Sequence, residues 1–305
     1  MLLDRAGFIA SAASFVLAQN KPLAVGVVPA ETYAEANFAN QVGIFAQNGL
    51  AVDVTVLANA GGVAAAVASG ALDIGIGSVG QIAAARENGI PLSLIAPGAL
   101  YNAKAPTGEL RVATWSKIEK ASDLNGKNIG IDNLRGLPQI SIDVWIRKNG
   151  GDTSTIKYIE LPFPAMAAAL QAGRIDAAVI AEPALTAARD TTRFFADTLS
   201  AIAGSFLISV WYAANPWLTA NLAVAHRFAA AIDQTARWAN SHHVESAPIV
   251  EALTKVAPDI AVRMRRAYFG TQLEPRLIDP LLVLAQQYGV TKTVLDGRSM
   301  IYPGF

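Results

Sequence analysis

The sequence contains no cysteine, and only three of its 305 residues are histidine. The absence of cysteine excludes disulfide bonds, thiolate metal sites and cysteine nucleophiles. His242 and His243 are adjacent in a polar segment, and no His-Glu-x-x-His spacing accompanies them or His226. We therefore expect no metal centre and no bound cofactor, and we interpret the adjacent histidines as part of a solvated helix end.

Neither sign of charge is in excess, because 24 Lys and Arg balance 24 Asp and Glu. The densest basic group is Arg263, Arg265 and Arg266, which is smaller than the basic patch typical of a nucleic-acid-binding surface. We therefore expect no nucleic acid among the partners. A hydrophobic content of 52% is sufficient for a substantial core in one large or two medium domains.

One apolar, uncharged run lies near the start of the sequence. The segment 6–18 carries no charge and ends in Val-Leu-Ala, which is close to a signal-peptidase site. It is shorter than the ~20 residues that a membrane-spanning helix needs. We predict an export signal over residues 1–18, a mature chain beginning at Gln19 and a periplasmic location. Asp4 weakens the positive start of such a signal, and an ordinary buried helix is the alternative.

The most informative feature that is present is a helix-strand-helix pattern that occurs twice. Within the stretch 64–79, Gly70 suits a helix end with positive φ, and the alternation Leu-Asp-Ile-Gly-Ile-Gly after it predicts a short strand. Ser78 is a competent N-cap for the next helix. The stretch 166–183 repeats the Gly-x-x-Asp spacing, with Gly173 as its glycine. The repetition indicates two similar α/β lobes, although this element is common in α/β proteins.

Strands alternate with helices along most of the chain. We expect strands over 21–28, 51–57, 72–76, 91–97, 109–115, 128–132, 156–161 and 175–180, near Phe194 and over 206–213. We expect helices over 33–48, up to Gly70, over 81–88 and 137–148, up to Gly173, after Pro183, and over 215–238, 246–256, 259–268 and 275–288, followed by an irregular tail over 291–305.

The predicted fold is α/β, with two Rossmann-like lobes, a ligand cleft between them and a helical C-terminal part. The turn-forming stretch 98–108 and the segment near 200–206 predict two crossings between the lobes. We therefore assign residues 19–107 and 206–305 to lobe 1 and residues 108–205 to lobe 2. Ligands of such sheets bind at the carboxyl ends of the strands.

Five segments together resemble the solute-binding proteins of ABC importers. They are AEANFANQVGIFAQNGLAVDV, GGVAAAVASGALDIGIGS, SDLNGKNIGI, the helix after Arg135-Gly136 and the EPAL element. The resemblance is to the group that contains sulfonate, taurine and nitrate binders and the NMT1/THI5-like proteins, and it covers nearly the whole chain after the predicted signal. It implies a type II periplasmic binding protein fold whose lobes close on a ligand by hinge motion.

The resemblance also implies ligand-binding residues in both lobes. They are Glu31, Tyr33, Gly61, Gly62, Ser78, Val79 and Tyr101, then Asn133, Arg135, Gly136, Leu137, Phe163, Glu182 and Phe206. Several lie at helix starts, which favour an oxyanion, and Arg135 would add a bidentate donor. However, Leu137 stands where anion binders of this group often have Ser or Thr, and Glu182 would repel an anion unless it is neutralised. A solvated Arg135 and a helix-capping Glu182 are the alternatives.

The function that the resemblance implies is a non-enzymatic, extracytoplasmic solute-binding protein that works with an ABC permease and ATPase. We expect a monomer that binds a small polar organic solute, namely a sulfonate-, taurine- or nitrate-like anion or zwitterion. One alternative is a binder of a thiamine-pyrimidine precursor on Tyr33, Phe163 and Glu182. A THI5-like pyrimidine synthase is another, but that activity is associated with a cysteine-rich motif that this chain lacks. A ligand sensor coupled to a membrane receptor is the third.

Overall fold

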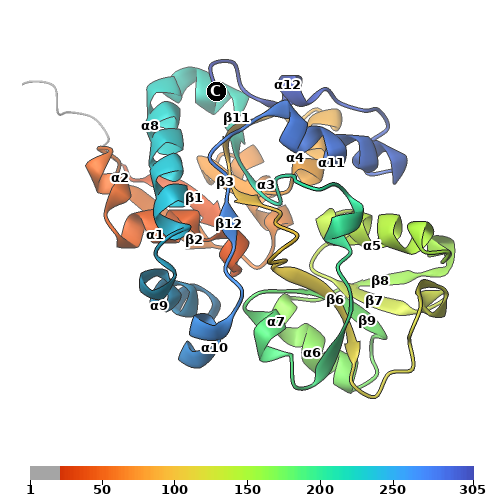
Figure 1. Cartoon of the computed structure of the whole chain (residues 1–305). Helices are drawn as coiled ribbons and strands as arrows, with labels where there is room; N and C mark the ends of the chain where they lie inside the picture. Colours follow the sequence, from red (N-terminus) through yellow and green to blue (C-terminus); the bar gives the residue numbers. More distant parts are fainter. Residues whose placement is uncertain (1–20) are drawn as a thin grey trace, which may run out of the picture.

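The computed structural model describes residues 21–305, which form two α/β lobes that lie side by side (Figure 1). The predicted export signal over residues 1–18 lies outside the described residues. Each lobe is built on its own five-stranded sheet, and a further two-stranded sheet joins β5 to β12. Within the described part of the chain, no helix has the length and apolar character needed to cross a membrane. The predicted α/β class is confirmed.

The first sheet has the strand order β2-β1-β3-β11-β4. Its strands are β1 (Leu23–Val27), β2 (Val52–Val56), β3 (Ile74–Gly77), β4 (Leu92–Pro97) and β11 (Val210–Ala214). β1 runs parallel to β2 and β3, whereas β11 runs antiparallel to β3 and β4. Every residue of β3 and β4 is buried, while the edge strand β2 is largely exposed. The chain leaves this sheet after β4 and returns to it with β11, which lies between β3 and β4.

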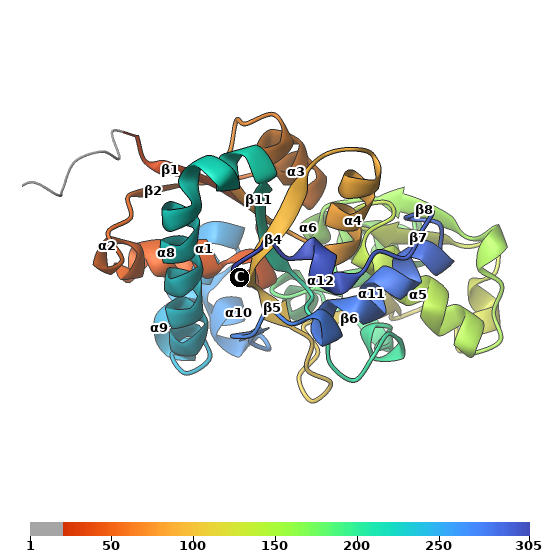
Figure 2. The same cartoon turned by 90° about the horizontal axis from the view of Figure 1, so that it is seen from above.

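Helices cover both faces of the first sheet (Figures 1 and 2). They are η1 (Glu31–Tyr33), α1 (Glu35–Gln41), α2 (Ile44–Gln47), α3 (Ala60–Ala68), α4 (Val79–Glu87), α8 (Asn215–Ala239), α9 (His243–Thr254), α10 (Pro258–Arg263), α11 (Pro275–Gln287) and α12 (Gly297–Met300). Gly75 lets α3 approach one face, since a Cβ there would lie 2.7 Å from Val63. Elsewhere in this lobe Trp211 of β11 meets Phe228 of α8 edge-on, with ring centroids 5.2 Å apart.

The second sheet has the order β10-β6-β9-β7-β8. Its strands are β6 (Gly108–Ala113), β7 (Asn128–Ile131), β8 (Lys157–Glu160), β9 (Ala177–Ala181) and β10 (Thr192–Ala196), and its helices are η2 (Ala121–Leu124), α5 (Leu137–Lys148), η3 (Thr153–Thr155), α6 (Phe163–Gln171), α7 (Ala184–Ala187) and η4 (Leu199–Ala201). β7 runs parallel to β8 and β9, and β6 runs antiparallel to β9 and β10. Parallel strands separated by helices give this lobe the same plan as the first.

The repeated Gly-x-x-Asp pattern has the same structure in both lobes. Gly70 and Gly173 have φ values of 77° and 66°, and each ends the helix before the strand as predicted. In the first lobe the carboxylate of Asp73 accepts the N–H of Ala24 at 2.8 Å, and in the second that of Asp176 accepts the N–H of Asn128 at 2.9 Å. The aspartate of each motif therefore ties the strand that follows it to the neighbouring parallel strand.

Three expectations from the sequence are wrong in detail. The helix predicted over 33–48 is divided, because η1 ends at Tyr33 and Gly43 separates α1 from α2 by taking a left-handed φ of 77° that an α-helix does not allow. The helix predicted over 259–268 ends at Arg263, and the chain continues into β12 (Tyr268–Phe269). The tail that was expected to be irregular contains α12, which Asp296 caps through the N–H groups of Arg298 and Ser299.

Two adjacent segments carry the chain between the lobes. The first follows β4 and contains β5 (Ala99–Leu100), and the second precedes β11. The N–H of Tyr101 donates to the carbonyl of Phe206 at 2.8 Å, and the two rings stack with centroids 5.0 Å apart. Leu100 and Leu207 form an antiparallel bridge. Because the segments are paired with each other, they form a short two-stranded connection between the lobes.

Candidate functional site

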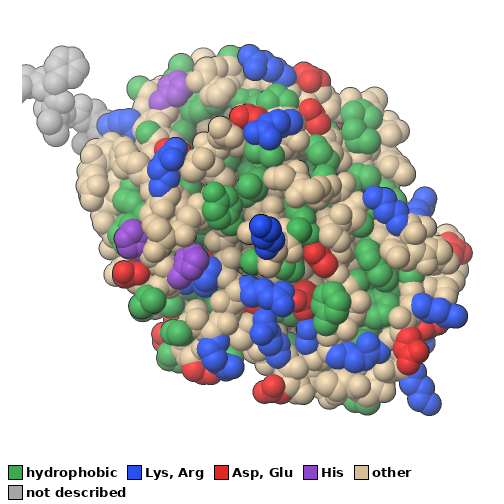
Figure 3. Space-filling view, viewed as in Figure 1, with side chains coloured by type: hydrophobic (Ala, Val, Ile, Leu, Met, Phe, Trp, Pro, Cys, Tyr) green, Lys and Arg blue, Asp and Glu red, His purple; other side chains and the backbone are tan. Residues whose placement is uncertain are grey.

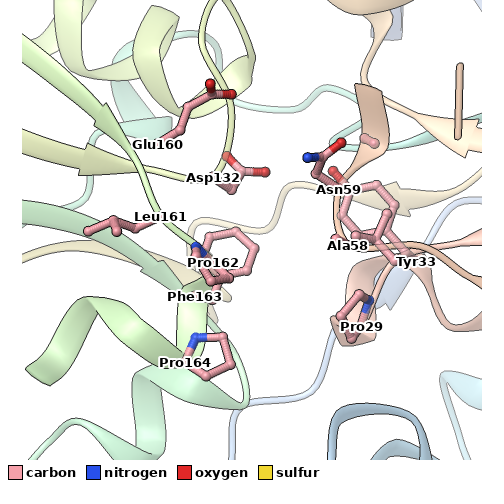
Figure 4. Close-up of a pocket in the computed structure, with 12 residues that line it drawn as sticks. Pro29, Tyr33, Ala58, Asn59, Asp132, Glu160, Leu161, Pro162, Phe163 and Pro164 are labelled. Atoms are coloured by element: carbon pink, nitrogen blue, oxygen red, sulfur yellow. The ribbon is translucent and has the colours of Figure 1, made fainter. Parts of the chain in front are cut away.

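A cavity of about 240 Å³ lies between the lobes. The first lobe contributes Val28, Pro29, Tyr33, Ala58, Asn59 and Ala60, and the second contributes Asp132, Glu160, Leu161, Pro162, Phe163 and Pro164. These residues follow the carboxyl ends of β1, β2, β7 and β8. Figure 4 shows the two walls facing each other across the gap. The cavity therefore occupies the place where ligands of parallel sheets bind.

Two aromatic side chains named from the sequence lie on opposite walls of this cavity. Tyr33 ends η1 in the first lobe, and Phe163 is the first residue of α6 in the second (Figure 4). Both rings also line a narrow extension of about 50 Å³, which Leu137 closes at the start of α5. Three of the predicted residues are thus brought together from separate elements, and they make the site largely apolar.

The charged groups of the cavity walls are both acidic. Asp132 follows β7 and Glu160 ends β8, so both belong to the second lobe. In Figure 4 the Asp132 carboxylate points across the gap toward Asn59. Glu160 accepts the N–H of Leu134 at 3.1 Å. Among the described residues, none with a basic side chain lines the cavity or its narrow extension.

The Asp132 carboxylate has unusual surroundings for an ionised group. Its Oδ1 atom is buried, and no hydrogen-bond partner for it is found within residues 21–305. Burial raises the pKa of Asp132 to about 6; the backbone N–H groups of Asp132 and Asn133 lower it, and the nearby Glu160 carboxylate adds to the rise. Burial also raises the pKa of Tyr33, as does the charge of Asp132. The site therefore contains a carboxylate that gains from any donor placed in the cavity.

The glycines predicted at the start of α3 lie beside the cavity. Gly61 and Gly62 follow Ala60 of the cavity wall, and the Gly62 N–H donates to the side chain of Asn59 at 2.8 Å. Asn59 is thus the N-cap of α3, and it already satisfies one of the free N–H groups of that helix end.

The other helix starts named from the sequence lie outside the cavity. Ser78 caps α4 in a capping box with Gln81, and Val79 is fully buried in the core. Asn133, Arg135 and Gly136 form the turn before α5, and none of them is among the residues that line the cavity. Arg135 has a φ of 59°, and its N–H donates to the side chain of Gln139 at 2.8 Å. Its exposed side chain fits the solvated alternative.

Glu31, Tyr101 and Phe206 are buried in contacts between segments of the chain. Tyr101 and Phe206 stack in the connection between the lobes, and the Tyr101 hydroxyl donates to Asp197 at 2.7 Å. Glu31 pairs with Arg266 at 2.5 Å and also accepts the N–H of Ala267. None of the three lines the cavity.

Glu182 is also held by its own surroundings. It is 2% exposed, and it accepts hydrogen bonds from the N–H and hydroxyl of Thr186, both at 2.9 Å, and from the N–H of Arg265 at 3.3 Å. Burial raises its pKa, while the bonds from Thr186 lower it. Its contact with Thr186, four residues on, agrees with the capping alternative. Glu182 faces a neighbouring cavity of about 480 Å³ that α6, α7 and the end of α9 line.

Asn59, Asp132 and Glu160 were not named from the sequence, although they supply most of the polar groups of the cavity. The signal that points to them is position, because Asp132 directly follows one parallel strand and Glu160 ends the next. Polar residues at the carboxyl ends of parallel strands are candidates for ligand contact. The site residues expected from the family resemblance do not include them, because that resemblance was applied only to positions that match the family's motifs.

The surface outside the cleft carries charges of both signs. Figure 3 shows Lys and Arg side chains gathered over the region between α7 and α10, with acidic side chains among them. There Glu109 pairs with both Arg111 and Arg265, so the positive groups are partly neutralised. Within residues 21–305, no group of three or more His, Asp or Glu is arranged to hold a metal ion.

Comparison with known proteins identifies both the family and the fold. The sequence pattern of the NMT1/THI5-like family matches residues 33–246. The structure is similar to the periplasmic aliphatic sulphonate binding protein SsuA from Escherichia coli, at 19% identity over 92% of both chains and a TM-score of 0.74.

It is also similar to the alkanesulfonate-binding protein SsuA from Xanthomonas axonopodis pv. citri bound to MOPS. The identity is 16% over 94% of this chain and 99% of that chain, with a TM-score of 0.76. The periplasmic nitrate-binding protein NrtA from Synechocystis PCC 6803 matches at 13% identity over 90% of this chain and 83% of that chain, with a TM-score of 0.77. These likenesses confirm the type II periplasmic binding protein fold. No curated protein matches the sequence.

Proposed function

Since the chain belongs to the NMT1/THI5-like family, we propose that it is the extracytoplasmic solute-binding component of an ABC importer. It holds a small polar organic solute between its lobes. The observation that carries this proposal is the cavity at the strand ends, which has aromatic rings on both walls and polar groups beside them. The sulfonate- and nitrate-binding functions of proteins with the same fold support an anion or a zwitterion as the solute.

The proposal includes the partners and the location. An ABC permease and ATPase receive the solute, and the mature protein begins at Gln19 in the periplasm as a monomer. The lobe limits stay as proposed from the sequence, with 19–107 and 206–305 in one lobe and 108–205 in the other. The paired connection between the sheets supports hinge closure about that boundary.

A binding role rather than catalysis is supported by the side chains that line the cavity. Among the described residues, no Ser or His lines it, so its walls lack the serine–histidine pair of an activated nucleophile. Asp132 and Glu160 lie on one wall beside aromatic and proline residues, which suits recognition of a ligand.

Native mass spectrometry of the full chain purified from its own host tests this proposal. We expect one small molecule per chain in the wild-type protein. Phe163→Ala should weaken its binding by about tenfold, because an aromatic contact contributes roughly 1 kcal/mol or more. Trp115→Ala is the matched control, since Trp115 is an exposed aromatic of the same lobe and lies outside the cavity. Equal loss in both variants, or no bound molecule in the wild type, would contradict the proposal.

A further inference from the structure

The charge of the cavity walls opposes a simple anion. Asp132 and Glu160 lie on one wall, and among the described residues no Lys, Arg or His lines the cavity to offset them. An anion placed there would meet two carboxylates, and the partly buried Asp132 would repel it more strongly than an acid in open water does. The side chains of this site therefore favour a positively charged or donor-rich group.

The backbone of the second lobe also offers few donors to an anion. A helix start normally presents several unpaired N–H groups. In α6 the N-cap is Pro162 and the second residue is Pro164, and neither has an N–H. The N–H of Ala165 already donates to the Pro162 carbonyl at 2.9 Å. Phe163 is thus left with the one free N–H of that turn, within the described structure.

The other two helix starts near the cavity each lose one donor. In α3 the Asn59 side chain accepts the Gly62 N–H. In α5 the second residue is Pro138, which has no N–H. Helix dipoles still point toward the cleft, but these helix starts offer fewer free N–H groups to an oxyanion than uncapped starts without proline would.

The two carboxylates of the cavity wall keep acceptor atoms that the described chain does not use. The buried Oδ1 of Asp132 has no hydrogen-bond partner within residues 21–305, and Glu160 uses one oxygen on the Leu134 N–H. A buried acceptor without a donor costs about 1–3 kcal/mol, and more when it is charged. Tyr33 and Phe163 lie on opposite walls beside these groups (Figure 4). Aromatic faces attract organic cations.

We propose that the solute carries a protonated amine whose N–H groups donate to the carboxylates of Asp132 and Glu160, between the rings of Tyr33 and Phe163. The inference rests on the proposed solute-binding function and assigns the chemical class of the solute. It favours a zwitterion over a simple anion such as nitrate. The raised pKa of Asp132, about 6, is consistent with an acid that has no basic side chain of the described residues beside it in the cavity.

Matched pairs of small probes test the assignment by calorimetry on the full chain. Each pair differs in an amine that is replaced by a hydroxyl, such as taurine against isethionate and ethanolamine against ethylene glycol. The set of probes also includes the molecule that mass spectrometry identifies in the host-purified protein, paired with an analogue of that molecule that lacks any amine. The amine member of the bound pair should bind at least tenfold more tightly, because charged hydrogen bonds are the stronger ones.

Variants separate the role of the carboxylates from a general effect of charge. Asp132→Asn and Glu160→Gln should each weaken the amine at least tenfold. Glu119→Gln should leave the affinity unchanged, because Glu119 is an exposed acid of the same lobe outside the cavity. Glu160 is also exposed, so its substitution tests the assignment even if Asp132→Asn does not fold.

Two different failures can be told apart. Tight binding of a solute without an amine, with unchanged affinity in both variants, would overturn this assignment and leave the solute-binding function intact. A wild-type chain that retains no solute from its host and binds neither member of any pair would contradict the proposed function, and the assignment with it.

Discussion

At the scale of single residues, buried acids define both the site and the response to pH. Asp132 lines the cleft, and its Oδ1 atom has no hydrogen-bond partner within residues 21–305, whereas Glu182 is satisfied by Thr186 and Arg265. The sequence alone does not separate these cases, because Arg265 lies far from Glu182 along the chain. It also gives no sign that Asp132 is the acid that remains free. The distinction depends on which segments the fold brings together.

The titration of Asp132 gives a prediction for binding. Its pKa of about 6 means that the carboxylate is charged at pH 7 and mostly neutral at pH 5. Affinity for an amine probe should therefore fall as the pH drops below about 6, by at most about tenfold per pH unit. Calorimetry between pH 5 and pH 8 measures this fall, and Asp132→Asn should remove it. An equal fall in the variant would show that another group titrates.

Glu35 gives a prediction for stability. It is fully buried, its Oε2 accepts the Trp211 indole N–H at 2.8 Å, and its Oε1 has no partner in the described chain. Burial raises its pKa well above the usual 4.5, so the folded protein keeps a proton that the unfolded chain loses. The contribution of Glu35 to the free energy of unfolding is fully present below about pH 4.5. It falls as the pH rises, by up to about 1.4 kcal/mol per pH unit.

Glu35→Gln should remove this part of the pH dependence, because the amide keeps an acceptor for Trp211 without a charge. We expect the variant to be more stable than the wild type at pH 8, with a smaller difference at pH 5. Denaturant unfolding at both pH values measures this, with Glu119→Gln as the control at an exposed acid. A variant that is less stable at pH 8 would show that the Glu35 charge is compensated.

At the scale of elements, the repeated motif fixes two strands by the same contact. The Asp73 and Asp176 carboxylates each accept one backbone N–H of the neighbouring strand, from Ala24 and Asn128. Substituting either aspartate by alanine should lower the free energy of unfolding by roughly 1.5–3 kcal/mol, the usual scale for a hydrogen bond with a charged partner. Asp190→Ala is the control, because Asp190 is exposed and makes no side-chain bond within residues 21–305. Equal losses at all three positions in denaturant unfolding would contradict the assigned role.

Much of the secondary structure could be predicted from the sequence. Gly70, Gly173 and the Ser78 cap act locally, through φ and a bond three residues away, so their patterns are visible in the sequence. The break at Gly43 was missed because an isolated glycine in a helical pattern is also compatible with a continuous helix. The short strand β12 at the end of the helix predicted over 259–268 was missed because Tyr268 and Phe269 pair with β5, which is distant in sequence.

At the scale of the whole molecule, contacts in three places join the lobes. One is the covalent connection, in which Tyr101 stacks on Phe206. Another lies between α5 and the end of α11, where hydrophobic side chains pack together and the Arg147 guanidinium lies 5.1 Å from the Tyr288 ring centroid. In the third, Arg265 pairs with Glu109 and its N–H donates to Glu182. The cavity lies between the lobes, so its width depends on how they rotate about the connection. A bound solute that contacts both walls should favour the closed arrangement.

Small-angle X-ray scattering of the full chain, with and without the solute identified by native mass spectrometry, tests the central claim most directly. If the solute binds between the lobes, its addition at saturation should decrease the radius of gyration while the far-ultraviolet circular dichroism stays unchanged. Phe163→Ala should require more solute for the same decrease. An unchanged radius at saturating solute would contradict binding in a cleft that closes between the lobes.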